Sequence, residues 1–121
     1  MDIKKIIVGE SELSEIISKE ILIKNIDDAL EIIGNAPSEY LIFSEHNFEK
    51  DFFDLSTRKL GNILQKFTTY RIKLAIIGDF EKYTSQTLKD FIRESNSHGD
   101  YLFVASKAEV IKRWWICYQQ S

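Results

Sequence analysis

The sequence contains little cysteine, little proline and no long apolar run, and each shortage excludes a class of protein. Cys117 is the one cysteine, so an internal disulfide and a cysteine-based zinc site are excluded, and a reducing, cytoplasmic location is indicated. Pro37 is the one proline, which argues against linkers and low-complexity segments. Because a membrane span needs roughly 20 apolar residues, we expect no membrane association.

A basic excess and a phosphate-binding loop are also missing. The formal net charge is -3, whereas nucleic-acid binding usually requires a basic face, so we expect no nucleic-acid partner. No Gly-x-Gly-x-x-Gly or Gly-Lys-Ser motif occurs, which removes the common nucleotide-binding loops. The histidines, His46 and His98, are far apart in the chain, so the sequence predicts neither a histidine-based metal site nor a cofactor.

What the sequence does contain is a regular alternation of apolar patterns. Runs typical of strands cover residues 3–8, 13–17, 40–43, 73–78 and 101–105, although 13–17 also fits one helical turn, and helical spacing covers 26–33, 60–67, 88–92 and 111–118. The order β-β-α-β-α-β-α-β-α predicts one α/β domain over residues 1–121, with a mixed, mostly parallel sheet. Because the run 73–78 is apolar throughout, we expect helices on both faces of the sheet.

Residues that cap helices stand close to the expected helix starts. Asn25 precedes the first helical stripe, Thr84-Ser85 precedes the third and Ser106 precedes the fourth. For the second stripe, the expected cap is Asp54 or Ser56.

A long ordered string of residues resembles one known family. The string comprises residues 51–55 (DFFDL), 60–67 (LGNILQKF), 70–80 (YRIKLAIIGDF), 83–85 (YTS) and 88–96 (LKDFIRESN). It is similar to the uncharacterised bacterial family called domain of unknown function 4180, over nearly the whole chain. The resemblance implies a small bacterial, cytoplasmic protein and no particular activity.

The element order also resembles the anti-sigma-factor antagonist (STAS) domain. The features that carry this fold-level analogy are a strand, a polar loop and then Asp54-Leu55-Ser56-Thr57 opening a helix, with Gly61 following. In STAS domains a partner kinase can phosphorylate a Ser or Thr at the start of that helix. The resemblance therefore implies that Ser56 and Thr57 are candidate phosphorylation sites and that the domain has a regulatory role.

Polar side chains follow the strands of the expected parallel sheet, where ligands usually bind. Glu45, Asp54 and Asp79 could form an acidic pocket that holds a cation or a small ligand, with Lys82 and Tyr83 beside it. The alternative is that these carboxylates only cap helices and brace turns. No Gly-x-Ser-x-Gly elbow is present, so the sequence does not predict a hydrolase.

Two groups of aromatic residues are candidates for partner binding. Phe48, Phe52 and Phe53 crowd into one otherwise charged loop, where they line the core or form part of a docking surface. Trp114 and Trp115 are adjacent on the last helix, and adjacent helical residues point about 100° apart. Simple packing on the sheet or a homodimer through this helix would each account for this pair.

These observations favour a binding role over catalysis. The leading hypothesis is a non-catalytic regulatory or protein-interaction module that presents the loop after residues 40–43, and the helix it opens, to a protein partner. The alternative hypothesis is a small-ligand or metal-binding site, and an enzyme built on it, that uses Glu45, Asp54 and Asp79.

Overall fold

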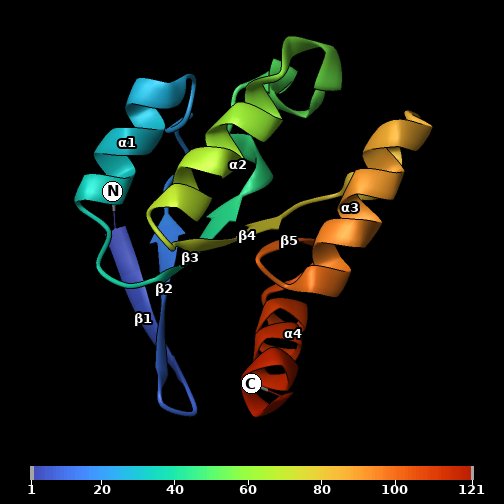
Figure 1. Ribbon diagram of the computed structural model, residues 1–121. Coiled ribbons are helices and arrows are strands. Elements are labelled where there is room, and N and C mark those ends of the chain that lie inside the picture. The colour runs from blue at the N-terminus through green and yellow to red at the C-terminus, as the bar shows by residue number, and fades with distance from the viewer. Residues whose placement is uncertain (1, 121) are drawn as a thin grey trace.

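The computed structural model describes the backbone of residues 2–120 and the side chains of residues 2–114 (Figure 1). The strands are β1 (Asp2–Val8), β2 (Ser11–Ile17), β3 (Tyr40–Ser44), β4 (Lys73–Ile77) and β5 (Tyr101–Val104). The α-helices are α1 (Ile26–Gly34), α2 (Lys59–Thr69), α3 (Gln86–His98) and α4 (Lys107–Gln120). Short 3₁₀ turns η1 (Glu45–Asn47), η2 (Lys50–Phe53) and η3 (Leu55–Thr57) follow β3, and η4 (Phe80–Lys82) follows β4. The predicted element order is confirmed.

The sheet has five strands in the order β1-β2-β3-β4-β5. β1 and β2 form an antiparallel hairpin, and Gly9 adopts the φ of 62° that its tight turn requires. The pairs β2–β3, β3–β4 and β4–β5 are all parallel, so the mixed, mostly parallel sheet is confirmed.

The strand order determines which helices cover which face. Each crossover from β2 to β5 moves one strand in the same direction, and crossovers of one hand then place α1, α2 and α3 on one face. Helix α4 follows the last strand and covers the opposite face, as Figure 1 shows. The expectation of helices on both faces is confirmed, with one helix alone on the second face.

The sheet therefore separates two hydrophobic cores. The first includes Phe43, Ile76 and Phe67, and lies between the sheet and α1–α3. The second includes Ala75 and Val110, and lies between the sheet and α4. No helix in the described part of the chain is long and apolar enough to cross a membrane.

Local capping explains three of the four helix starts. Asn25 Oδ1 accepts a hydrogen bond from the Asp28 N–H at 2.9 Å, which begins α1 as predicted. The hydroxyls of Ser85 and Ser106 accept bonds of 3.2 Å from the third residue of α3 and of α4, respectively. The start of α2 differs from the prediction.

Candidate functional site

The side chain of Glu45 joins the loops that follow β3 and β4. Its carboxylate accepts a hydrogen bond from the Tyr83 hydroxyl and forms an ion pair of 2.7 Å with Lys82 Nζ. The Asp79 N–H also donates to Glu45 Oε1 at 3.3 Å. Four of the five predicted ligand-binding residues therefore lie together, but the carboxylate at their centre already has partners from the protein.

The contact between these loops is close enough to require a glycine. A Cβ atom at Gly78 would lie 2.6 Å from both Cβ and Oε1 of Glu45. Burial, and then the hydrogen bond to Glu45, raise the pKa of Tyr83 well above its usual range. Tyr83 therefore keeps its proton and donates it to the bond. We call Glu45, Gly78, Lys82 and Tyr83 the loop latch.

The acidic pocket predicted from Glu45, Asp54 and Asp79 does not form. Asp54 instead accepts bonds from the Ser56 N–H (3.0 Å) and the Ser56 hydroxyl (2.7 Å). These two bonds, the side-chain bond first, lower the pKa of Asp54. No group of three His, Cys, Asp or Glu residues within the described part of the chain could hold a metal ion. Because its local hydrogen bonds hold Asp54 in its own turn, it does not join Glu45 and Asp79.

Helix α2 begins later than predicted, and neither Asp54 nor Ser56 caps it. Both lie in or before η3, and α2 starts at Lys59 after Arg58, whose φ is 62°. The Thr57 hydroxyl donates to the main-chain oxygens of Asp51 and Asp54, and it accepts from the Lys59 N–H at 3.3 Å. Of the two predicted phosphorylation sites, Ser56 is thus exposed and Thr57 is held in the turn.

The loop that contains these residues is also tied to α2 by charge. Lys59 Nζ lies 2.9 Å from Asp51 Oδ2 and 3.2 Å from Glu49 Oε2. The hydrogen bond with Asp51, more than that with Glu49, raises the pKa of Lys59.

Phe48, Phe52 and Phe53 do not form a docking surface, because all three are buried. Their exposed fractions are 3%, 1% and 4%. The rings of Phe48 and Phe52 are 4.4 Å apart, and those of Phe52 and Phe53 are 5.0 Å apart. The Phe53 ring also packs against Tyr83 of the loop latch. The three rings are therefore the core beneath the long loop.

Trp114 is likewise part of the core. It is 4% exposed, and its Nε1 donates to the Gly99 oxygen at 2.8 Å while its ring meets Tyr40 edge-on. Of the two alternatives given for the tryptophan pair, Trp114 thus follows the packing on the sheet, and its buried side chain is not open to a partner. Trp115 lies outside the residues whose side chains the structure describes.

Sequence reasoning missed Asn47, which is fully buried at 0% exposure. Its side-chain oxygen accepts from the Ser44 N–H at 2.9 Å, and its Nδ2 donates to the oxygens of Ser18 (3.1 Å) and Glu20 (2.9 Å). Its own main-chain oxygen accepts from the N–H groups of Leu22 and Ile23. Asn47 thus ties the end of β3 to the segment before α1.

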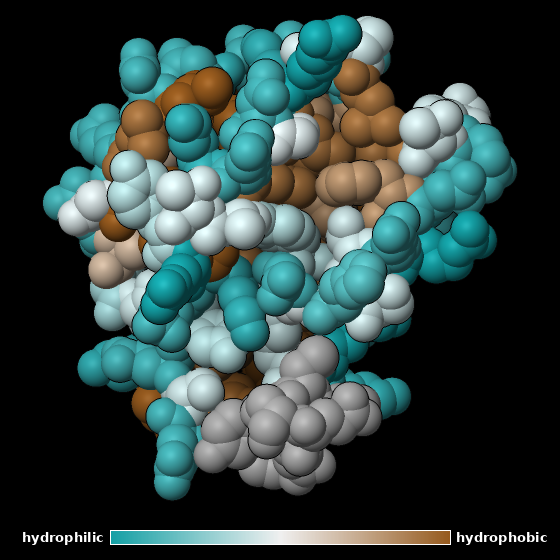
Figure 2. Space-filling model, viewed as in Figure 1, coloured by the Kyte–Doolittle hydropathy of each residue, from teal (hydrophilic) through white to brown (hydrophobic). Residues whose placement is uncertain are grey.

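A groove of about 450 Å³ lies between α2 and α3. Its apolar lining consists of Leu64 from α2, Phe91 from α3 and Tyr101 from β5. Figure 2 shows hydrophobic residues gathered between these two helices. Gly61 lies on the α2 wall, and Glu94 lies on the α3 wall.

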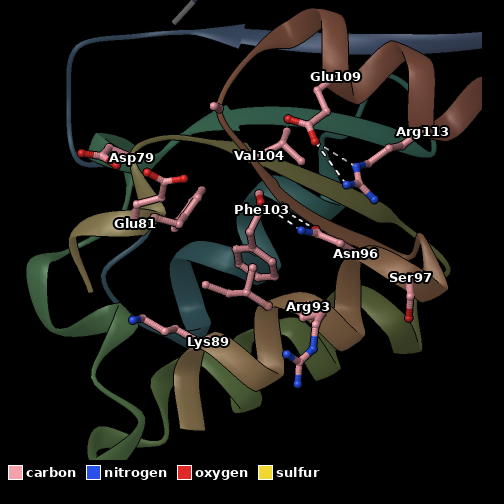
Figure 3. A pocket seen from close by; sticks show the side chains of 13 residues that line it. Asp79, Glu81, Lys89, Arg93, Asn96, Ser97, Phe103, Val104, Glu109 and Arg113 are labelled. Carbon is pink, nitrogen blue, oxygen red and sulfur yellow. Dashed lines mark hydrogen bonds and ion pairs between the residues drawn. The ribbon is translucent and has the colours of Figure 1, made fainter. Parts of the chain in front are cut away.

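A crevice of about 920 Å³ lies between α3 and α4 (Figure 3). It opens beside β5, where the chain leaving β4 turns to one face and the chain leaving β5 turns to the other. Such divergence of connections is where parallel sheets usually bind ligands. Asp79 is the one predicted ligand-binding residue that lines this crevice.

A family model described as Domain of unknown function (DUF4180) matches residues 8–114. The match covers most of the chain, including the string of residues 51–96 that carried the resemblance. No curated protein and no solved structure matches the chain.

Proposed function

The chain belongs to the family described as Domain of unknown function (DUF4180), and we propose that it is a non-catalytic protein-interaction module. The groove between α2 and α3 would receive an amphipathic helix of a protein partner. As in the hypothesis from the sequence, α2 contacts the partner. The groove beside α2, and not the buried phenylalanines of the loop, now provides the apolar surface.

The single observation that carries the proposal is the apolar lining of the groove. Leu64, Phe91 and Tyr101 line a groove that α2 and α3 flank, and hydrophobic residues gather there in Figure 2. The Tyr101 hydroxyl donates to the Leu64 oxygen at 2.7 Å, so the polar atom on this lining is already satisfied. An amphipathic helix docks by placing its apolar face in a groove of this kind.

Gly61 supports the same proposal. Glycine inside a helix costs about 0.5–1 kcal/mol relative to alanine. At Gly61 an added Cβ would meet no atom within 4 Å, so the packing of the chain itself does not require the glycine. A partner helix that approaches α2 closely would require it.

The charge of the groove indicates the chemistry of the partner. Glu94 and Asp100 line the groove, and His98 is the one basic side chain there among the described residues. A partner helix with lysine or arginine beside its apolar face would complement this rim.

The resemblance to the anti-sigma-factor antagonist domain supports a regulatory role for this binding. The single cysteine and the bacterial family resemblance support an action in the bacterial cytoplasm.

A matched pair of glycine variants tests the proposal. A Cβ atom added at Gly61 or at Gly34 would meet no atom of another part of the chain within 4 Å, but only Gly61 of the two lines the groove. We expect Gly61→Leu and Gly34→Leu each to raise the unfolding free energy by roughly 0.5 kcal/mol, because leucine is the better helix former.

Binding should separate the two variants. With the wild-type chain as bait, cross-linking and mass spectrometry should map a bound helix to α2 and α3. Gly61→Leu should retain at least fivefold less of that partner, and Gly34→Leu should retain the wild-type amount. Equal retention by both variants, or cross-links confined to other faces, would contradict the proposal.

A further inference from the structure

Strand β5 is an edge strand of the sheet. About half of its main-chain N–H and C=O groups therefore point away from β4, the neighbouring strand. The oxygens of Val104 and Asp100 point inward, since they accept from the N–H groups of Gly78 (2.9 Å) and Leu74 (3.1 Å). The N–H and C=O groups of successive residues in a strand point to opposite sides. Those of Phe103 therefore point outward, where the sheet has no further strand.

The Asn96 side chain occupies this outward position. The Phe103 N–H donates to Asn96 Oδ1 at 2.8 Å, and Asn96 Nδ2 donates to the Phe103 oxygen at 3.1 Å (Figure 3). A carboxamide has the same donor and acceptor as a peptide group. Asn96 therefore makes with Phe103 the pair of bonds that a residue of a neighbouring strand would make.

The space around this amide can hold a chain segment. The crevice of about 920 Å³ follows the outer side of Phe103, Val104 and Ala105. Ile92 of α3 provides an apolar wall on one side, and α4 closes the other side. An extended segment placed there would be covered on both of its faces.

The α3 wall and the α4 wall of the crevice differ in charge. On α4, Glu109 and Arg113 neutralise each other across 3.2 Å. On α3, Lys89 forms no ion pair with any described residue, and Arg93 is paired only with the exposed Asp90. Asp79 and Glu81 lie at the η4 end of the crevice. Along most of α3, the crevice thus presents cations to whatever lies in it.

We propose that the crevice is a second binding site, which takes an extended acidic peptide segment of a protein partner as an added strand on β5. The Asn96 carboxamide holds the place of the segment's peptide group in the free protein. Side chains of an added strand alternate in direction, so every second one would face α3, and carboxylates there would meet Lys89 and Arg93. This site is separate from the groove and does not depend on it.

The test uses two blocked peptides, acetyl-Val-Glu-Val-Glu-Val-amide and acetyl-Val-Lys-Val-Lys-Val-amide. Each is titrated into the ¹⁵N-labelled full chain, and the amide resonances of Phe103 and Ala105 are followed. The glutamate peptide should move both resonances and bind at least threefold more tightly than the lysine peptide. Resonances of Gly61 and Leu64 in the groove should stay unchanged.

Variants separate a place-holding role of Asn96 from a merely structural one. Asn96→Ala should bind the glutamate peptide at least threefold more tightly than the wild type, because the peptide no longer competes with the carboxamide. Ser97→Ala, which changes the next residue of the same crevice wall, should bind like the wild type.

The exposed Lys89→Glu variant keeps the test decisive even where Asn96→Ala does not fold, and it should reverse the preference between the peptides. Unmoved Phe103 and Ala105 resonances at millimolar peptide, or a preference that Lys89→Glu leaves unchanged, overturn the proposal. Weaker binding by a folded Asn96→Ala would also overturn the place-holding role.

Discussion

Asn47 shows how much of this fold depends on one buried amide. Its side chain satisfies the main-chain groups of Ser44, Ser18 and Glu20 at once. We expect Asn47→Ala to lower the unfolding free energy by about 2–3 kcal/mol, because three partly buried main-chain groups lose a hydrogen-bond partner and the buried amide leaves a cavity. Urea unfolding measures this, and Asn62→Ala, an exposed change on α2, should stay within about 0.5 kcal/mol. Similar values for both variants would contradict the assigned role of Asn47.

Tyr83 should give the protein a measurable alkaline sensitivity. An unfolded tyrosine releases its proton near pH 10, whereas burial and Glu45 raise the pKa of Tyr83 in the folded chain. Above pH 10 the folded state therefore binds more protons than the unfolded state, and its stability falls as the pH rises. Below pH 10 both states hold the proton, so this loss is absent.

Tyr83→Phe should remove that loss. At pH 8 we expect the variant to be less stable by about 1–2 kcal/mol, because the bond to the Glu45 carboxylate is gone. The difference in unfolding free energy between the variant and the wild type should narrow as the pH rises from 10 to 11.5. The pKa of Tyr101 is also raised, mainly by burial, and its contribution should persist in the variant. Parallel stability curves over this range would refute the assignment.

At the scale of elements, the sequence identifies helix caps, but it does not identify irregular turns. The caps Asn25, Ser85 and Ser106 act within three or four residues, so the sequence identifies them without knowledge of the fold. The start of α2 could not be read in this way. Two 3₁₀ turns and the positive φ of Arg58 intervene, and a hydrophobic pattern does not encode either feature.

The phenylalanines of the long loop illustrate the same limit. When only the periodicities of helices and strands are considered, three phenylalanines among charged residues are expected to be exposed. The short turns η1 and η2 instead fold the loop back, so that Phe48, Phe52 and Phe53 share one core. In contrast, the sequence could bring together Glu45, Asp79, Lys82 and Tyr83, because the carboxyl ends of parallel strands share one edge of the sheet.

The two predicted phosphorylation sites, Ser56 and Thr57, differ in how accessible their hydroxyls are. Ser56 is exposed, while three hydrogen bonds occupy the Thr57 hydroxyl, so Ser56 is the more accessible of the two candidate residues. We expect Ser56→Asp to lower partner binding at least threefold, because a second negative charge beside Asp54 disturbs the turn that leads into α2. Ser56→Ala should bind like the wild type. Equal binding by both variants, with no phosphate on Ser56 in the native protein, would contradict the hypothesis that phosphorylation of Ser56 regulates partner binding.

At the scale of the whole molecule, the sheet order explains where the two proposed sites lie. Crossovers that advance in one direction place α1, α2 and α3 on one face, and the groove opens between the last two. The crevice opens on the other side of α3, because α4 alone turns to the opposite face. The alternation of elements predicted a parallel sheet, but strand order, and hence these two openings, depends on tertiary packing that periodicity does not record.

The prediction of a homodimer through α4 also belongs to this scale. The sheet covers Val110 and Trp114 of this helix, at 0% and 4% exposure. Trp115 is the next residue in the sequence, and its predicted role rests on the sequence alone: a helix turns about 100° per residue, so neighbours do not share one contact face. A second copy of the chain is the partner that the sequence hypothesis assigned to this helix.

Sedimentation velocity decides whether that dimer exists. The wild type should sediment as a dimer at micromolar concentration, and Trp115→Lys should weaken the association roughly 30-fold, since an interface tryptophan contributes about 2 kcal/mol and 1.4 kcal/mol is tenfold. Lys112→Ala, an exposed change on the same helix, should leave the association unchanged. At concentrations low enough for the wild type and both variants to be monomeric, their thermal unfolding should agree, because the Trp114 bond to Gly99 is untouched. A wild type that remains monomeric at micromolar concentration would leave α4 with its sheet contact alone, and the interaction surfaces would then be the groove and the crevice.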